Sequence, residues 1–207
     1  MNPSSPSIRR RRAVCGLLAA GALALACGPA GAAPLTQVGG VRFAPDLQLA
    51  GQALSLNGAG LRAIPLLTGF AAALYVGRRS DDPRQLVEQP GAKRLQIRML
   101  LDVPAEEFVK AFHKGVARNT PAPEQPPLAE RMERFDGLLR RIGKVKKGDL
   151  VNLDYVPGQG LLFSHNARLL GPAIPGEDLY GALLRVFIGE RPVDPELKAG
   201  LLGRGGA

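Results

Sequence analysis

The chain has 207 residues, with 27 Lys and Arg against 18 Asp and Glu, and a formal net charge of +9. It has no Trp and few aromatic residues, so the stacking platforms typical of nucleic-acid binders are missing and we predict no nucleic-acid partner. A mildly basic balance instead suits weak attraction to anionic lipid or to acidic small molecules.

The N-terminal residues are typical of a signal peptide. Arginines 9–12 form a positive segment, and residues 13–26 form an apolar stretch too short to span a bilayer comfortably. Ala30, Gly31 and Ala32 then make a small-x-small cleavage site. We therefore predict a signal peptide over residues 1–32 and a mature domain over residues 33–207, periplasmic or secreted.

Two alternatives concern the same segment. The apolar stretch is retained as a membrane anchor in one, and Cys27 is lipidated in the other. Ala24, three positions before Cys27, is smaller than the aliphatic residue usual in lipoproteins, which disfavours lipidation.

Cleavage would remove both cysteines, Cys15 and Cys27, so the mature domain is predicted to have no disulfide or thiol chemistry. It would also remove four basic residues and no acidic ones. That leaves 23 basic against 18 acidic residues, a net charge of +5. A mature domain of this length can be stable through core burial alone.

The first half of the domain is predicted to be mainly extended. Residues 48–56 alternate around Ala50-Gly51, as in a hairpin. Residues 61–76 follow as one longer extended region. A short helix capped by Ser80 comes next, and residues 94–100 alternate apolar and basic side chains, as in a strand with one solvated face.

Helices dominate the second half. Asp102 is predicted to cap a helix over residues 104–118, and an amphipathic helix covers residues 128–142. A hairpin follows from residue 150, then a helix over residues 177–188 and a terminal helix capped by Asp194. Strands and helices do not alternate regularly, which favours an α+β domain.

Several motifs do not support a metal site, a catalytic site or a phosphate-binding site. His113 and His165 lie on separate elements without metal-ligand spacing, so we predict no metal site and no cofactor. Ser164 and His165 are neighbours on a strand and point to opposite faces, which excludes a direct nucleophile–base pair. Residues 57–60 lack the third glycine and the lysine of a phosphate-binding loop.

Arg62 is the candidate binding residue. Its guanidinium is charged at every relevant pH and suits a carboxylate or enolate oxygen. No acid lies between Asp46 and Asp81, and Gly58 and Gly60 permit close approach of backbone or ligand. We expect these glycines to make room for the ligand that Arg62 holds. A cation beside an apolar strand suits the binding of an amphipathic anion. The alternative is that Arg62 is an ordinary surface arginine without a binding role.

Three stretches resemble the chalcone isomerase family, in particular its bacterial, exported chalcone isomerase-like group. They are LNGAGLR followed by GFAAALYVG, VKKGDLVNLDYVPGQG in the centre, and LLRVFIGERPVDPELKAGLLG at the end. The resemblance as a whole spans roughly residues 39–203. The resemblance implies an open-faced β-sandwich, in which helices cover a large antiparallel sheet and a ligand cleft lies between them.

The resemblance also implies roles for single residues. Arg62 falls on the arginine that holds the phenolate in the isomerases and meets a carboxylate in fatty-acid-binding members. The other catalytic positions fall on Phe70, Phe108, Gly115 and Val186, where the enzymes carry polar groups. Only the cation of the catalytic set is therefore retained.

We expect a non-catalytic protein that binds a fatty acid or another small amphipathic carboxylate. Its predicted binding residues are Arg62, Thr68 (the nearest hydroxyl on the same strand face), Phe70, Phe108 and Phe112. The alternatives are an intramolecular lyase or isomerase, with Arg62 stabilising an oxyanion, and an envelope interaction module with a vestigial cleft. Peripheral contact with membrane lipid is a further expectation, and the sequence indicates no oligomeric state.

Overall fold

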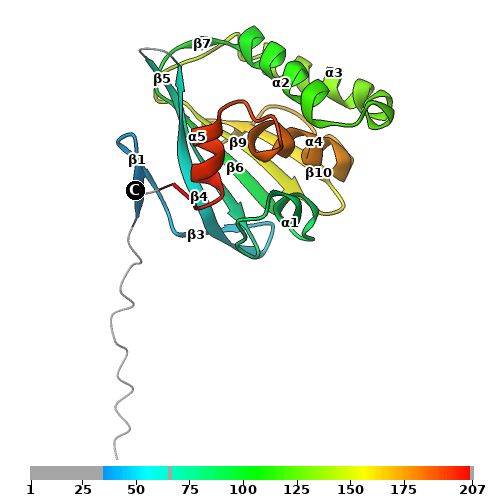
Figure 1. Ribbon diagram of the computed structural model, residues 1–207. Helices are drawn as coiled ribbons and strands as arrows, with labels where there is room; N and C mark the ends of the chain where they lie inside the picture. Colours follow the sequence, from blue (N-terminus) through cyan, green and yellow to red (C-terminus); the bar gives the residue numbers. More distant parts are fainter. Residues whose placement is uncertain (1–34, 65–66, 206–207) are drawn as a thin grey trace, which may run out of the picture. The chain divides into compact units, whose positions relative to one another are not determined.

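The computed structural model of the chain describes residues 35–64 and 67–205 (Figure 1). The predicted signal peptide and Cys27 lie outside these residues. Seven strands form one antiparallel sheet in the order β11-β10-β9-β6-β5-β4-β3. The strands are β3 (Asp46–Leu49), β4 (Gln52–Ile64), β5 (Leu67–Val76), β6 (Lys93–Met99), β9 (Leu150–Val156), β10 (Gly160–His165) and β11 (Arg168–Leu169).

Five α-helices, two short 3-10 helices (Ala122–Glu124 and Pro126–Leu128) and two small two-stranded sheets complete the described fold. The helices lie on one side of the large sheet, and the β1–β2 hairpin lies on the other (Figure 1). This mixed arrangement confirms the predicted α+β class. The helices are α1 (Pro83–Glu88), α2 (Ala105–Asn119), α3 (Ala129–Arg140), α4 (Glu177–Ile188) and α5 (Pro195–Leu201), and the small sheets pair β1 (Thr36–Val38) with β2 (Val41–Phe43) and β7 (Val103–Pro104) with β8 (Lys144–Val145).

The predicted hairpin around Ala50-Gly51 is confirmed, and both turn residues have positive φ, 49° and 77°. The prediction of one extended region over residues 61–76 is wrong. Residues 61–64 complete β4, and β5 returns antiparallel beside it from Leu67. Apolar residues continue on both sides of the reversal, so the hydrophobic pattern does not reveal it.

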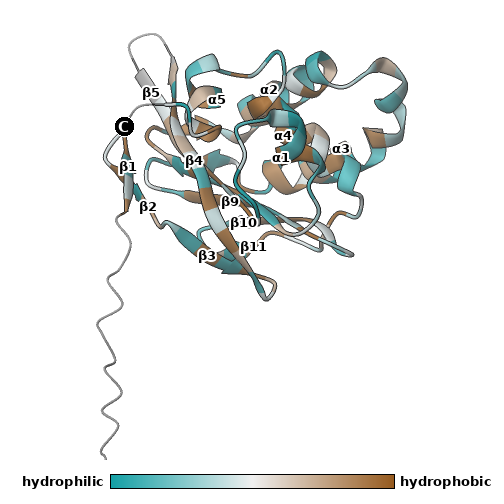
Figure 2. Cartoon of the chain, turned by 60° about the horizontal axis from the view of Figure 1, so that its bottom comes forward, coloured by the Kyte–Doolittle hydropathy of each residue, from teal (hydrophilic) through white to brown (hydrophobic). Residues whose placement is uncertain are grey.

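The large sheet separates two apolar cores. Alternate residues of β5 face opposite sides: Phe70 and Leu74 join the helix-side core, whereas Tyr75 joins the smaller core under the β1–β2 hairpin. The Tyr75 hydroxyl donates to the Ala44 carbonyl at 3.0 Å. Colour alternates between brown and teal along α2 and α3, as expected of helices with one face on a core (Figure 2).

Two predicted helix caps are wrong. Asp82, not Ser80, caps α1 by accepting from the Arg84 backbone N–H at 2.8 Å. Asp102 does not cap α2; it accepts instead from the Lys147 N–H at 2.9 Å. The predicted cap of α5 is confirmed, because Asp194 accepts from two backbone N–H groups. None of the described helices is long and apolar enough to cross a bilayer.

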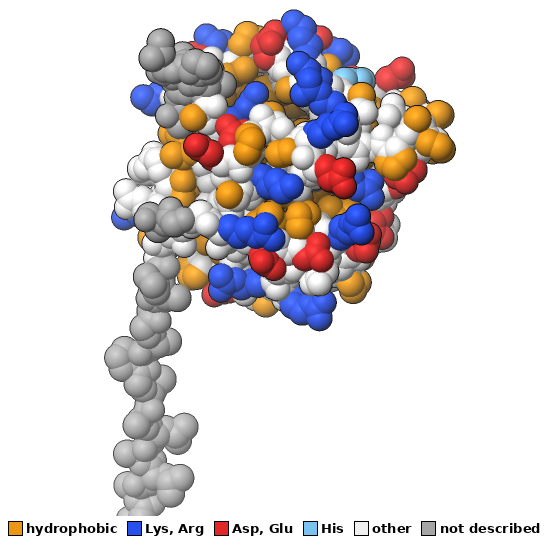
Figure 3. Space-filling model, viewed as in Figure 1, with side chains coloured by type: hydrophobic (Ala, Val, Ile, Leu, Met, Phe, Trp, Pro, Cys, Tyr) orange, Lys and Arg blue, Asp and Glu red, His pale blue; other side chains and the backbone are white. Residues whose placement is uncertain are grey.

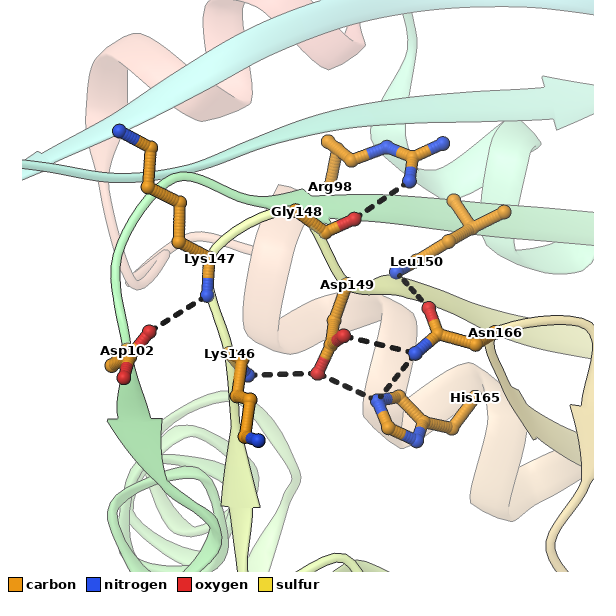
Figure 4. A network of polar contacts seen from close by, with 9 residues as sticks. All are labelled: Arg98, Asp102, Lys146, Lys147, Gly148, Asp149, Leu150, His165 and Asn166. Carbon is orange, nitrogen blue, oxygen red and sulfur yellow. Dashed lines mark hydrogen bonds and ion pairs between the residues drawn. The ribbon is translucent and has the colours of Figure 1, made fainter.

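Asp149 ties together the turns at one end of the sheet (Figure 4). Its carboxylate accepts from the Lys146 N–H at 2.7 Å and from Asn166 Nδ2 at 2.9 Å, and it lies 2.8 Å from His165 Nε2. Burial alone would raise the pKa of Asp149. The hydrogen bonds outweigh it and lower the pKa from 3.8 to about 2.

This depressed pKa predicts acid sensitivity. The folded pKa of Asp149 lies below its unfolded value, so its carboxylate stabilises the fold above about pH 4 and loses that effect toward about pH 2. Urea unfolding across this window should show a steeper fall in unfolding free energy for the parent than for Asp149→Asn. Parallel pH profiles of the two proteins would contradict the prediction.

Candidate functional site

An apolar cavity of about 70 Å³ lies between the helix-side face of the sheet and α2, α3 and α4. Arg62, Phe70, Phe108 and Phe112 all line it, so the fold brings together four of the five predicted binding residues. The side chain of Thr68, the fifth, lies outside the described residues. The remaining lining is apolar: Ile97, Met99, Ala111, Phe135, Leu139, Ile142, Val145, Val151, Leu153, Phe163, Leu183, Val186, Phe187 and Val193.

Strand register places Arg62 at the cavity. Arg62 on β4 is paired with Phe70 on β5, and side chains of paired residues project from the same face of a sheet. The guanidinium carbon of Arg62 lies 5.7 Å from the centre of the Phe70 ring, within cation–π range. Phe70 is buried, so its ring forms a fixed floor beneath the cation.

The charge of Arg62 is only weakly compensated within the described part of the chain. Burial lowers the pKa of Arg62, and the negative charge of Asp194 acts in the opposite direction. No carboxylate among the described residues forms a salt bridge with it. Asp194 accepts instead from Glu196 and Leu197 at the start of α5. A guanidinium stays charged even when partly desolvated, so Arg62 can attract an anion.

Gly58 and Gly60 serve backbone packing and not the ligand. A Cβ atom on Gly58 would lie 2.2 Å from the Gly200 carbonyl oxygen, and one on Gly60 would lie 2.9 Å from the Leu197 carbonyl oxygen. The two glycines therefore allow α5 to lie directly on β4. The expectation that they make room for a ligand is wrong.

Asn57, the residue at the bulge in β4, also stabilises the contact between α5 and β4. Its Nδ2 donates to the Leu201 carbonyl at 2.8 Å, and its Oδ1 accepts from the Ser80 N–H at 2.8 Å. Helix α5 follows directly after Val193 and Asp194, which lie near Arg62. Gly58 and Gly60 thus position the residues beside the cavity indirectly, because they allow α5 to pack on β4.

Three positions where the resemblance implies polar groups in the enzymes are apolar cavity walls: Phe70 on β5, Phe108 on α2 and Val186 on α4. The fourth, Gly115, packs helix against helix: a Cβ there would lie 2.5 Å from Val186 Cγ1. A longer polar side chain at Gly115 would need α2 and α4 to separate. The described cavity therefore offers Arg62 as its charged group.

Three aromatic rings form the centre of the cavity wall, and the sequence analysis identified only one of them as a site residue. The Phe135 ring centre lies 5.0 Å from that of Phe112 and 5.3 Å from that of Phe163. Phe135 lies in the amphipathic helix predicted over residues 128–142, but periodicity alone does not show which inward-facing residues meet across a cavity.

The histidines have local acidic partners. His113 Nε2 lies 2.7 Å from Asp136 Oδ2, and His165 Nε2 lies 2.8 Å from Asp149 Oδ2. Ser164 is buried on the other side of β10 from His165, as predicted, and its hydroxyl accepts from Asn152 Nδ2 at 3.3 Å. Within residues 35–64 and 67–205, no group of three His, Cys, Asp or Glu residues could hold a metal ion.

A curled antiparallel sheet with helices over an apolar cavity is the open-faced arrangement that the chalcone isomerase resemblance implies. The chain matches the family model described as chalcone isomerase-like over residues 35–203, and it belongs to that family. A search of the curated proteins finds no match.

Among solved structures, a fatty-acid binding protein of Arabidopsis thaliana has a similar fold. The two share 15% sequence identity and superpose with a TM-score of 0.61, over 79% of this chain and 92% of the plant chain. At this identity the likeness establishes the fold alone. The predicted α+β open-faced fold is thereby confirmed.

Proposed function

We propose that this protein binds a fatty acid or another small amphipathic carboxylate without catalysing a reaction, and that it does so in the periplasm or outside the cell. The observation that carries the proposal is the position of Arg62. It presents a weakly compensated cation at the edge of a cavity whose other lining side chains are all apolar. An amphipathic carboxylate has the complementary distribution of charge and apolar surface.

The expected energies favour such a ligand. A charge-assisted hydrogen bond from Arg62 to a carboxylate contributes roughly 1.5–3 kcal/mol. Each methylene of the tail that leaves water contributes about 0.8 kcal/mol. A tail of several methylenes would therefore contribute more than the head group, and Arg62 would set orientation as well as affinity.

The cavity must widen to accept a long tail. Its volume of about 70 Å³ is well below the roughly 300 Å³ at which small-molecule sites begin. Phe108 on α2 and Ile142 after α3 are partly exposed, so they can move with less loss of packing than the buried rings. Ligand entry is therefore expected to displace α2 and α3 from the sheet.

The fold supports this proposal by analogy. The plant protein of similar fold is named as a fatty-acid binding protein. The isomerase alternative receives less support, because Phe108, Gly115 and Val186 stand where the resemblance implies polar catalytic groups. An interaction module with a vestigial cleft would leave Arg62 without a function.

The test compares ligand retention by the mature parent, Arg62→Met and the control Arg42→Met, each purified from the periplasm. Arg42 is exposed on β2 and away from the cavity, so the control removes one charge without touching the site. Organic extracts of each protein are analysed by mass spectrometry. We expect a stoichiometric carboxylic acid in the parent and in Arg42→Met, with at least about a tenfold loss in Arg62→Met, as expected for a contact of about 1.5 kcal/mol or more.

Added dodecanoate gives an independent readout. The parent and Arg42→Met should gain thermal stability with increasing dodecanoate, because a ligand that binds the folded state stabilises it, and Arg62→Met should gain less. Equal retention and equal stabilisation in all three proteins would refute Arg62 as the anchor. Turnover of an enone substrate by the parent, lost in Arg62→Met, would instead establish the isomerase alternative.

A further inference from the structure

Most of the net positive charge of the described chain is accounted for by side chains at one end of the sheet. Backbone hydrogen bonds hold this end together: Met99 N–H to Asp149 O at 3.0 Å, Gly148 N–H to Met99 O at 2.9 Å, and Asn166 N–H to Leu150 O at 2.7 Å. The surface, termed the basic end below, carries Arg98, Arg141, Lys144, Lys146, Lys147 and Arg168 beside two acidic residues, Asp102 and Asp149. Its net charge is +4, and that of residues 35–205 as a whole is +5.

Both acids of the basic end are committed to local partners. Asp149 is bound by Lys146 N–H, Asn166 and His165, and Asp102 accepts from Lys147 N–H (Figure 4). Asp102 also forms an ion pair with the Lys144 ammonium group at 2.9 Å, so Lys144 is a paired cation. The ammonium groups of Lys146 and Lys147 form none of these contacts, and both residues are exposed. The acids thus organise the turns, while several cations face solvent.

An exposed apolar side chain lies within this charge. Leu169 on the edge strand β11 is 57% exposed and follows the exposed Arg168. Leu35, at the start of the described residues, is the other large exposed hydrophobic residue of the described chain. On the face shown in Figure 3, by contrast, basic and acidic side chains are interspersed with hydrophobic ones.

A shallow groove on the basic end shares one lining residue with the ligand cavity. Its lining consists of Arg141, Ile142, His165, Arg168, Leu169 and Leu170, and Arg141 Nη1 donates to the Leu170 carbonyl at 3.3 Å. Ile142 also lines the apolar cavity. One partly exposed side chain therefore borders both the groove and the cavity.

We propose that the basic end docks the protein on an anionic phospholipid bilayer. Lysine and arginine side chains would meet lipid phosphates, and Leu169 would enter the boundary between head groups and acyl chains. A lipid surface supplies both the anionic and the apolar complement, whereas a purely polyanionic partner leaves Leu169 in water. Docking would also bring the wall at Ile142 next to a source of acyl chains.

Vesicle sedimentation tests the proposal with the full mature protein. The vesicles consist of phosphatidylcholine alone or of phosphatidylcholine with phosphatidylglycerol. The test variants are the double variant Arg141→Gln/Arg168→Gln and Leu169→Ser, and the matched controls are Arg42→Gln/Arg78→Gln and Leu35→Ser. Arg42 and Arg78 are exposed and lie outside the basic end.

We expect binding only to the vesicles that contain phosphatidylglycerol, and weaker binding at higher salt. Each arginine lost from the basic end should weaken binding by about fivefold, so the test pair should lose about 25-fold and the control pair less than about twofold. Leu169→Ser should bind more weakly than Leu35→Ser.

Three results would overturn the proposal: equal binding to both kinds of vesicle, equal loss in test and control pairs, or retention on heparin without binding to vesicles. The last would assign the basic end to a polyanionic partner. Arg62→Met should bind vesicles like the parent, since Arg62 is not part of the basic end. Failure of docking and failure of carboxylate binding are therefore distinguishable.

Discussion

Gly58→Ala is expected to destabilise the protein by about 3 kcal/mol. The new methyl carbon would lie 2.2 Å from the Gly200 carbonyl oxygen, 2.6 Å from the Gly203 nitrogen and 2.8 Å from the Leu201 carbonyl oxygen. All three atoms belong to the backbone, so no rotamer change can relieve the clash. Helix α5 would have to leave β4, which would expose the buried Leu197 and Leu201.

Gly137→Ala is the matched control for this prediction. Gly137 lies within α3, and a Cβ there would meet no atom within 4 Å. Alanine should therefore stabilise the helix by about 0.5–1 kcal/mol. Urea unfolding of both variants measures the difference. A Gly58→Ala protein as stable as its parent would show that the contact between α5 and β4 is looser than described.

Arg94→Met is expected to cost about 3 kcal/mol of unfolding free energy, through a different mechanism. Arg94 on β6 holds Asp154 on β9 by two hydrogen bonds of 2.6 Å, from Nε to Oδ1 and from Nη2 to Oδ2. The Asp154 side chain is only 9% exposed. Removal of the guanidinium therefore leaves a nearly buried carboxylate without its partner.

The double variant Arg94→Met/Asp154→Leu separates the loss of the pair from the cost of an orphaned charge. Apolar replacement of both partners removes the desolvation penalty as well as the attraction, so the double variant should be more stable than Arg94→Met. Thermal and urea unfolding of parent, single and double variants provide the measurement. A double variant less stable than Arg94→Met would contradict the prediction, because it would show that Asp154 stabilises the fold even without its arginine partner.

Local patterns in the sequence predicted helices and strands well where a capping or turn residue marks the end of the element. Asp194 followed by Pro195 defines the start of α5, and the left-handed turn at Ala50-Gly51 defines the first hairpin. The reversal between β4 and β5 was missed because its flanks are uniformly apolar. Asp102 was misassigned because its partner, the Lys147 N–H, is 45 residues away.

The sequence predicted most of the residues of the candidate site, but it did not predict the contacts that form the cavity. Arg62 and its phenylalanine neighbours followed from charge, strand parity and family resemblance, and the fold places four of the five predicted side chains at one cavity. The role of Gly58 and Gly60 was assigned wrongly, because sequence shows that two glycines permit close approach but not which group approaches. Phe135 and Phe163 join the cavity through contacts between distant segments.

The seat of α5 on β4 also has a consequence for the kinetics of folding. Asn57 and Leu201 are separated by 144 positions, and Val193 contributes to the cavity wall. Contacts at such separation form slowly, because a long loop must close before they can stabilise anything. The binding cavity can therefore form only after nearly the whole chain has left the ribosome. For most of its synthesis, a nascent chain lacks the segment that completes this cavity.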